Sequence, residues 1–269
     1  MTTRIHPTAI VDPEAELGDG VEVGAYAVIG AGVEIGAGTR IDAGAHVRGP
    51  ATLGRDNQVC SQACLGFDPQ DVKYGGEPTR LVVGDRNRFR ELCTIHRGTA
   101  AGGGVTTIGD DNLFMAYTHV AHDCRVGSRT VFANAGTLAG HVEVQDDAVV
   151  GAFSSVHQFC RVGRHAYIGG YSVITRDPLP YVKTVGMKPA CYGINRIGLQ
   201  RKGFSVETLK ALETAYRVLV RGKHSVPKAL ELLRGLEEQP EVRVMIEFAE
   251  GSARGLIRDL PGGGRGGVG

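Results

Sequence analysis

The chain has 269 residues and a formal net charge of +1 at pH 7, with 40 glycines and no tryptophan. A charge this close to zero argues against a nucleic-acid binder or a polybasic membrane-surface protein. The glycines follow no Gly-X-Y period, which excludes collagen, and no apolar run is long enough to predict a transmembrane segment.

An apolar residue returns at every sixth position, a small residue usually follows four positions later, and glycine often stands next to the apolar residue. A period of six matches neither an α-helix nor simple strand alternation. It predicts a short strand followed by a corner, repeated as an all-β solenoid with the apolar side chains inside. The first run is Ile5, Val11, Leu17, Val23, Ile29, Ile35, Ile41, Val47, Leu53, Val59 and Leu65, and the longest is Ile108, Phe114, Val120, Val126, Phe132, Leu138, Val144, Val150, Val156, Val162, Ile168 and Ile174.

The repeat predicts a solenoid domain over residues 1–185, interrupted by excursions at about 66–82 and 96–107. The second excursion contains a glycine run, 102–104, which lacks the Gly-Lys-Ser/Thr ending of a phosphate-binding loop and is interpreted as flexible. Excursions from a solenoid are where function usually lies.

A connector is predicted over 186–202, and a small all-α domain over 203–260. Ser205, Ser225 with Pro227, and Pro240 have the pattern of helix starts, and leucines at helical spacing follow the first two. The glycine-rich tail, 261–269, is expected to be disordered.

The six cysteines form no C-x-x-C motif, and the first residues contain no apolar signal core. We therefore expect a cytoplasmic protein with reduced thiols. Cys93, Cys124 and Cys160 fall in the small-residue position of the repeat, where packing is their expected role.

His122 and Asp123 are the best candidates for chemistry. His141 follows His122 by 19 residues and His157 follows His141 by 16, so the three should lie on roughly one face of successive coils. Imidazole titrates near neutral pH and suits a general base, and a neighbouring carboxylate can orient it. The alternative interpretation is a set of polar residues on an exposed solenoid face.

Several motifs together resemble the UDP-N-acetylglucosamine O-acyltransferases that begin lipid A synthesis, from residue 1 to about 258. They are Asp71-Val72-Lys73-Tyr74, Glu77-Pro78-Thr79-Arg80, Ile95-His96-Arg97-Gly98-Thr99, Asp111-Asn112-Leu113, Ala121-His122-Asp123-Cys124, Leu138-Ala139-Gly140-His141-Val142, Val156-His157-Gln158-Phe159-Cys160 and Arg254-Gly255-Leu256-Ile257-Arg258. The resemblance implies a left-handed parallel β-helix with three hexapeptides in each coil. Sequence physics alone favours no such hand, because crossover connections are generally right-handed.

The resemblance also implies a reaction, in which a (R)-3-hydroxyacyl chain moves from acyl carrier protein to the glucosamine 3-hydroxyl of UDP-N-acetylglucosamine. His122 matches the general base, Asp123 its orienting partner, and the Gly140 N–H the oxyanion donor. The residues that match the substrate sites are Asp71, Lys73, His96, His119, His141, His157, Gln158, Gly170, Asn195, Arg201 and Lys202. Lys202 stands where an arginine is common, and Ile197 where an acidic residue can occur.

The family is trimeric, with each active site between two subunits, so the resemblance implies a homotrimer. It implies no metal and no cofactor beyond the phosphopantetheine of acyl carrier protein. Three alternatives stay open: an N-acyltransferase on a 3-amino UDP-sugar, a zinc enzyme resembling the γ-class carbonic anhydrases, and a non-catalytic β-helix. The residues do not determine the acyl chain length.

Overall fold

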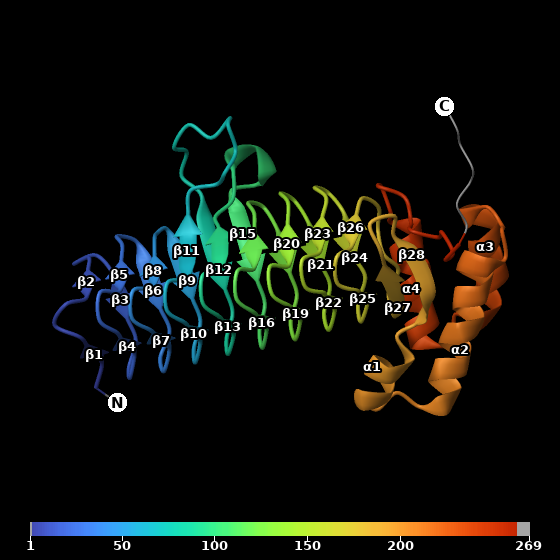
Figure 1. The fold of residues 1–269 in the computed structure, drawn as a ribbon, viewed down its shortest axis with the longest axis horizontal. Coiled ribbons are helices and arrows are strands. Elements are labelled where there is room, and N and C mark those ends of the chain that lie inside the picture. Colours follow the sequence, from blue (N-terminus) through green and yellow to red (C-terminus); the bar gives the residue numbers. More distant parts are fainter. Residues whose placement is uncertain (1, 263–269) are drawn as a thin grey trace.

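The computed structural model describes residues 2–262. It is a long prism of stacked coils with helices gathered at its C-terminal end, and loops project from the side of the prism (Figure 1). Most of the tail predicted at 261–269 lies outside the described residues.

Within residues 2–262 the strands form three sheets of eleven, nine and eight strands. Sheet 1 contains β1 (Arg4–Ile5), β4 (Glu22–Val23), β7 (Arg40–Ile41), β10 (Gln58–Val59), β13 (Arg88–Phe89), β16 (Leu113–Phe114), β19 (Val131–Phe132), β22 (Val149–Val150), β25 (Tyr167–Ile168), β27 (Val182–Val185) and β28 (Ala190–Ile194). Sheet 2 contains β2 (Ile10–Val11), β5 (Val28–Ile29), β8 (His46–Val47), β11 (Cys64–Phe67), β14 (Thr94–His96), β17 (His119–Val120), β20 (Thr137–Leu138), β23 (Ser155–Val156) and β26 (Val173–Ile174). Sheet 3 contains β3 (Glu16–Leu17), β6 (Val33–Ile35), β9 (Ala51–Leu53), β12 (Arg80–Val83), β15 (Val105–Ile108), β18 (Arg125–Val126), β21 (Glu143–Val144) and β24 (Arg161–Val162).

Strands on successive coils pair in parallel and in constant register. Val120 pairs with Leu138 and Leu138 with Val156, so residues 18 apart lie one above the other. These side chains are buried, which confirms the inward position predicted for every sixth residue. At the N-terminal end the inward residue Ile5 stays 48% exposed, and Val11 and Leu17 are only half-buried, because the first coil has a neighbour on one side only.

The turns between strands form three long edges, which we name by the sheets they join. The 1–2 edge includes residues 169–172, the 2–3 edge residues 121–124, and the 3–1 edge residues 145–148. Most turns contain one residue with a positive φ, and from Tyr117 to Tyr171 such residues recur at every sixth position. This strict period fixes which side chains share an edge.

Both interruptions of the repeat lie on the 2–3 edge. The first loop spans 68–79 between β11 and β12, and the second spans 97–104 between β14 and β15. Both are shorter than the predicted excursions, 66–82 and 96–107, because the flanking residues extend the strands.

A row of buried asparagines shows that the coils stay in register across these loops. Asn57, Asn87 and Asn112 are separated by 30 and 25 residues instead of 18. Even so, the Asn87 amide donates to Asn57 Oδ1 (3.0 Å), and the Asn112 amide donates to Asn87 Oδ1 (2.9 Å). The loops therefore project from the 2–3 edge without disturbing the prism beneath them.

The segment predicted as a connector, 186–202, is more ordered than expected. It includes β28, which pairs antiparallel with β27 and ends sheet 1, and the short helix α1 (Arg196–Arg201). Sequence reasoning missed the strand because a single antiparallel strand carries no six-residue period.

The C-terminal helices follow as α2 (Val206–Tyr216), the π-helical turn η2 (Arg217–Arg221), α3 (Val226–Leu233), the 3₁₀ turn η3 (Arg234–Leu236) and α4 (Pro240–Glu250). The predicted starts are confirmed: Ser205 and Ser225 cap α2 and α3, and Pro240 begins α4. No helix within the described residues is long and apolar enough to cross a membrane.

The helices cover the last coils of the prism. The Tyr216 hydroxyl donates to the Cys191 carbonyl (3.1 Å), and Leu256 forms a β-bridge with Asp177. Leu199, Leu212 and residues of the last coils belong to one buried apolar cluster. The helical part therefore supplies the cap that a solenoid end requires.

Candidate active site

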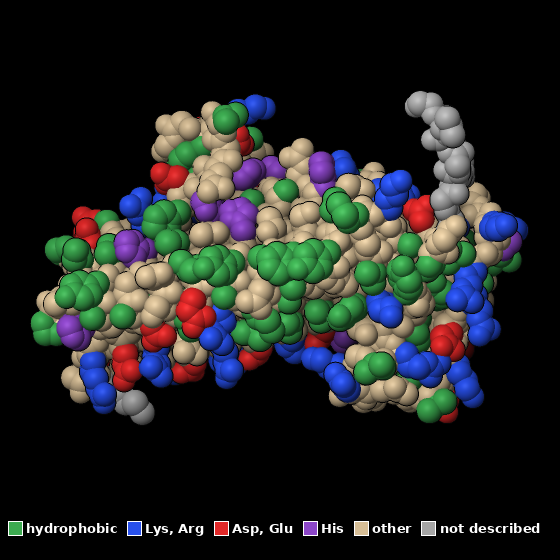
Figure 2. Space-filling view, viewed as in Figure 1, with side chains coloured by type: hydrophobic (Ala, Val, Ile, Leu, Met, Phe, Trp, Pro, Cys, Tyr) green, Lys and Arg blue, Asp and Glu red, His purple; other side chains and the backbone are tan. Residues whose placement is uncertain are grey.

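Histidines gather on the 2–3 edge, at the foot of the projecting loops. Figure 2 shows them as a group of purple side chains below the projection. His122 and His141 lie in successive turns of this edge, and His96 and His119 lie on the strands that lead to it. None of the four points into the apolar interior, so the site residues face outward as the predicted chemistry requires.

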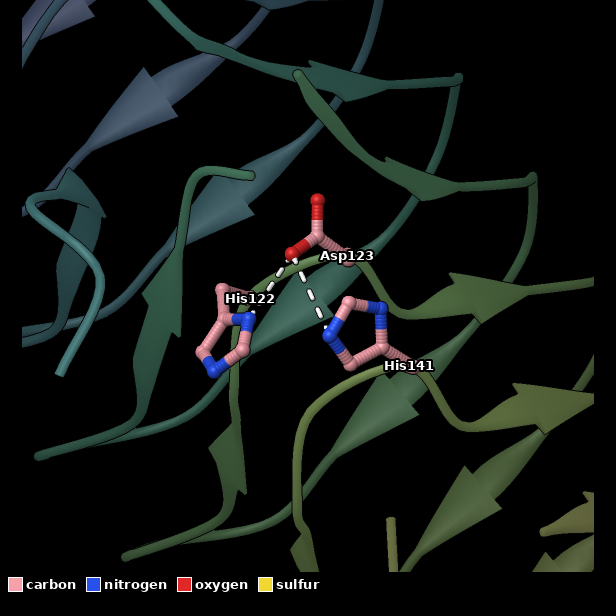
Figure 3. A group of neighbouring side chains, drawn as sticks. All are labelled: His122, Asp123 and His141. Carbon is pink, nitrogen blue, oxygen red and sulfur yellow. Dashed lines mark hydrogen bonds and ion pairs between the residues drawn. The ribbon is translucent and has the colours of Figure 1, made fainter. Parts of the chain in front are cut away.

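His122 and Asp123 form a hydrogen-bonded pair (Figure 3). His122 Nδ1 lies 2.8 Å from Asp123 Oδ2, and the carboxylate can only accept, so Nδ1 carries the proton. The Asp123 side chain is 1% exposed and that of His122 is 14% exposed. This arrangement leaves the second ring nitrogen, Nε2, as the atom able to accept a proton from a ligand.

Gly140 lies directly beneath the His122 ring, because it is 18 residues further along the chain and so occupies the same turn position on the next coil. A methyl group at Gly140 would come within 2.5 Å of His122 Cε1 and 2.8 Å of Nε2. Within the described residues the Gly140 N–H has no hydrogen-bond acceptor. A free backbone donor therefore lies beside the proton-accepting nitrogen.

His141 occupies the same turn position as Asp123, one coil later, and its φ of 61° matches the 58° of Asp123. Its Nε2 lies 3.8 Å from Asp123 Oδ2, and its ring packs edge to face on His122 with centroids 5.1 Å apart (Figure 3). Phe159, one coil further, stacks on His141 with the ring centroids 4.6 Å apart. The ring of His141 is thus held beside the pair.

His119 and His96 form a second pair of rings, with centroids 5.2 Å apart. His119 Nδ1 lies 2.8 Å from the Thr94 hydroxyl, and His96 Nδ1 donates to the Asp68 carbonyl (2.6 Å). Burial is the main cause that lowers the pKa of His119 to about 4, and the neighbouring His96 and His122 contribute to the same shift. Burial also lowers the pKa of His96, so both rings are neutral at pH 7.

These lowered pKa values predict that stability falls in acid. Between pH 6.5 and about 4 the unfolded chain binds a proton at His119 that the folded chain does not, so the free energy of unfolding decreases as pH decreases. Urea unfolding measured at several pH values should show this slope. His119→Gln should reduce the slope, and the same change at the exposed His224 should leave it unaltered. Equal slopes for the wild type and His119→Gln would contradict the prediction.

The 68–79 loop contains Asp71 and Lys73, and Arg97 ties its base to the prism. The Arg97 guanidinium donates to the Gly49 carbonyl (2.6 Å) and to the Tyr74 hydroxyl (3.1 Å), and it also pairs with the Asp68 carboxylate. Asp71 Oδ1 accepts from the Lys73 N–H (2.9 Å), and the Lys73 side chain is exposed at the loop tip. The loop is therefore fixed at its base, with a cation at its tip.

His157 and Gln158 lie on the same edge, two coils beyond His122. His157 is exposed, and its Nδ1 lies 3.2 Å from an Arg254 guanidinium nitrogen. It makes no contact with the His122–Asp123 pair. Its outward face and the exposed Gln158 extend the polar edge toward the C-terminal helices.

The remaining predicted site residues lie away from the 2–3 edge. Gly170 is on the 1–2 edge. Asn195 immediately precedes α1, and its side-chain amide donates to the His165 carbonyl (3.4 Å) instead of capping the helix. Lys202 Nζ donates to Asp147 Oδ1 (2.8 Å) on the 3–1 edge. Arg201 is exposed beside it. One copy of the chain does not bring these residues to His122.

His122, Asp123 and His141 are the group within residues 2–262 compact enough to be considered for a metal ion, since one ligand atom from each lies within 4.8 Å of the others. The hydrogen bonds that His122 and Asp123 make do not favour metal binding. His122 Nδ1 carries a proton, and both Asp123 oxygens accept hydrogen bonds from the protein. A metal at this position would have to break that network.

Comparison with known proteins identifies the family to which the chain belongs. Residues 177–257 match the model described as UDP-N-acetylglucosamine O-acyltransferase, domain 2, and residues 2–37 match the bacterial transferase hexapeptide model. A relative from Burkholderia orbicola (strain MC0-3), named acyl-[acyl-carrier-protein]–UDP-N-acetylglucosamine O-acyltransferase, is 50% identical over 261 residues, covering 95% of this chain and 100% of the relative. The chain belongs to the UDP-N-acetylglucosamine O-acyltransferase family. The resemblance noted in the sequence is thereby confirmed.

Other members of this acyltransferase family agree with the assignment. A relative of the same name from Halorhodospira halophila (strain DSM 244 / SL1) is 51% identical over 257 residues, covering 95% of this chain and 100% of the relative. The solved UDP-N-acetylglucosamine acyltransferase of Francisella novicida is 36% identical with a TM-score of 0.93, covering 95% of this chain and 94% of that one. The solved O-acyltransferase of Moraxella catarrhalis is 41% identical with a TM-score of 0.92, covering 94% and 99%.

Proposed function

We propose that this chain transfers a (R)-3-hydroxyacyl group from acyl carrier protein to the 3-hydroxyl of UDP-N-acetylglucosamine, the first step of lipid A synthesis. The observation that carries the proposal is the His122–Asp123 pair, with its free Nε2 beside the free Gly140 N–H. The names of the relatives supply the substrates.

In the proposed mechanism His122 Nε2 takes the proton from the sugar 3-hydroxyl while the hydroxyl oxygen attacks the thioester carbon. The Gly140 N–H donates to the oxyanion that forms, an interaction worth about 3–4 kcal/mol in comparable sites. The C–S bond then breaks, and the leaving thiolate receives the proton from the His122 imidazolium. Asp123 holds Nδ1–H throughout and stabilises the positive charge on the ring.

An acyl-transfer assay tests the proposal. The enzyme is given UDP-N-acetylglucosamine, or its 3-amino analogue, with acyl carrier protein loaded with (R)-3-hydroxyacyl chains of several lengths. We expect an ester product from the first acceptor. A product from the 3-amino sugar alone would instead favour the N-acyltransferase alternative, in which the same base deprotonates an amine.

We also propose a left-handed coil, a cytoplasmic location and a homotrimer in which neighbouring chains complete each site. Supporting the trimer, the residues matched to substrate are divided among all three edges of one chain. Large apolar side chains also stay exposed along the flank of the prism (Figure 2), including Tyr117 (63%), Phe153 (57%) and Tyr171 (68%). Light scattering should then give three times 28.5 kDa, and a crystal structure would test the hand of the coil.

We further propose that the reaction needs no metal or other cofactor. The support is chemical, because the imidazole and the backbone N–H supply both the base and the oxyanion donor. Elemental analysis of active enzyme tests this. Stoichiometric zinc, together with activity lost to a chelator and restored by zinc, would favour the carbonic-anhydrase-like alternative.

Acyl chain selection offers a further test at Gly170. A methyl group there would lie 3.2 Å from the Ala152 carbonyl oxygen, so the turn can accept a side chain with a small adjustment. If the acyl groove passes this position, Gly170→Met should shift the preference to shorter chains in a donor panel. As a control, Gly235→Met is suitable, because no atom lies within 4 Å of a Cβ built at Gly235. An unchanged chain-length preference in Gly170→Met would refute this use of the position.

A further inference from the structure

The 97–104 loop closes over the Asp123 carboxylate. The Thr99 N–H donates to Asp123 Oδ1 (2.9 Å), and the Thr99 hydroxyl donates to Oδ2 (2.7 Å), the same oxygen that accepts from His122 Nδ1. Thr99 is itself 5% exposed. One residue thus holds both carboxylate oxygens, from a segment 24 positions earlier in the chain.

The loop is built to make this contact. Thr99 also caps the 3₁₀ turn η1 (Ala100–Gly102), because its side-chain oxygen accepts the Gly102 N–H (3.1 Å). Gly102 lies so close to Asp123 that a methyl group would overlap the carboxylate, and one at Gly98 would come within 2.8 Å of Oδ1. Gly102, the first residue of the glycine run that was predicted to be flexible, therefore packs directly on the Asp123 carboxylate.

From this geometry we propose that Thr99 is a positioning residue for the transfer reaction, acting through Asp123 on His122. The inference depends on the proposed function. The two Thr99 donors fix the rotation of the carboxylate, so that Oδ2 faces Nδ1 and keeps the ring in the tautomer with a free Nε2. Thr106 Oγ1, which accepts the Asp123 N–H (2.8 Å), holds the backbone but does not touch the carboxylate oxygens.

The test compares Thr99→Val, which removes the hydroxyl but keeps the N–H and the shape, with Thr99→Ser, which keeps the hydroxyl. We expect kcat of Thr99→Val to fall about ten- to fiftyfold, since a lost hydrogen bond to a charged group commonly costs this much. The KM for UDP-N-acetylglucosamine should stay within about twofold, because the Thr99 side chain is buried beneath the site surface. Thr99→Ser should recover most of the kcat.

A spectroscopic readout separates positioning from simple folding. Nitrogen NMR of the imidazole rings should show His122 with its proton on Nδ1 in the wild type and a mixture of tautomers in Thr99→Val. Thr130→Val is the matched control: its hydroxyl is buried and donates to Asn112 Oδ1 (2.7 Å) on the 3–1 edge, and its loss should alter neither kcat nor the His122 signal.

The outcomes separate this inference from the proposed function. If the wild type transfers no acyl group, the proposed function fails, and if His122→Ala retains full activity, the proposed mechanism fails. If those two results are as expected but folded Thr99→Val keeps wild-type kcat and the wild-type tautomer, the positioning role of Thr99 is wrong and the reaction stands. The positioning role is also wrong if kcat falls in Thr99→Val while the His122 tautomer stays that of the wild type, and if Thr99→Ser does not recover kcat.

Discussion

His122→Ala should reduce kcat by about 10²–10⁴, the usual contribution of a general base. The variant keeps Asp123 and the Gly140 N–H, so the sugar hydroxyl would meet the thioester with nothing positioned to take its proton. The fold should survive, because the inward apolar residues of these coils are untouched. The measurement is steady-state transfer to UDP-N-acetylglucosamine, with circular dichroism to show the coil intact.

The pH profile gives this prediction a second readout. In the wild type the acidic limb of kcat/KM should report protonation of the base in the free enzyme, and the residual activity of His122→Ala should lack that limb. The exposed His224 provides the control, since His224→Gln should retain both the rate and the limb. A folded His122→Ala enzyme with near-normal turnover would exclude His122 as the base.

The coils and their inward face could be predicted from the sequence because the repeat acts locally. Each six-residue repeat contributes one apolar residue at a fixed interval. The spacing of residues such as Val120, Leu138 and Val156 is therefore enough to predict that they are buried. The sequence spacing also contained the information that the site residues stack on successive coils. Asp123 and His141 are separated by one full coil of 18 residues, as are His122 and Gly140, which puts each pair in the same turn position. The separations between the histidines alone, which are 19 and 16 residues, do not reveal these pairs separated by 18.

Other parts of the site could not be read from the repeat. Thr99 meets Asp123 across 24 residues, and Arg97 meets Tyr74 across 23, through loops that follow no period. Motif spacing cannot give such contacts, because they depend on how an inserted loop folds back on the prism. The antiparallel strand β28 was missed for the same reason.

The division of the predicted site among three edges has a physical meaning for the family. A prism exposes flat walls, and in the proposed trimer a neighbouring chain would supply a second wall for the sugar nucleotide and the acyl chain. Gly170 on the 1–2 edge and Lys202 on the 3–1 edge meet the His122 edge only if neighbouring chains pack side by side. The sequence of one chain therefore predicts the surface of each subunit, whereas the cleft would form only in the proposed assembly.

Gly140→Ala should lower kcat by about 10²-fold although it removes no functional group. The added methyl would come within 2.5 Å of His122 Cε1, 2.8 Å of Nε2 and 3.1 Å of Nδ1. All three nearest atoms belong to the His122 ring, so the ring must move. A displacement of about 1 Å from the reacting geometry can cost two orders of magnitude. The hydrogen bond from Nδ1 to Asp123 should lengthen as the ring tilts away from the coil beneath it.

Gly30→Ala is the matched control for this substitution, because Gly30 lies on the same 2–3 edge several coils away and a methyl group there would make contacts of 3.6 Å or longer. That variant should keep wild-type kcat and melting temperature. Nitrogen NMR of His122 then identifies the cause in Gly140→Ala, since a displaced ring loses its defined tautomer while the coil remains folded. Full activity in Gly140→Ala would mean that the His122 ring has room the structure does not show, and that the contact with Gly140 does not hold the base in place.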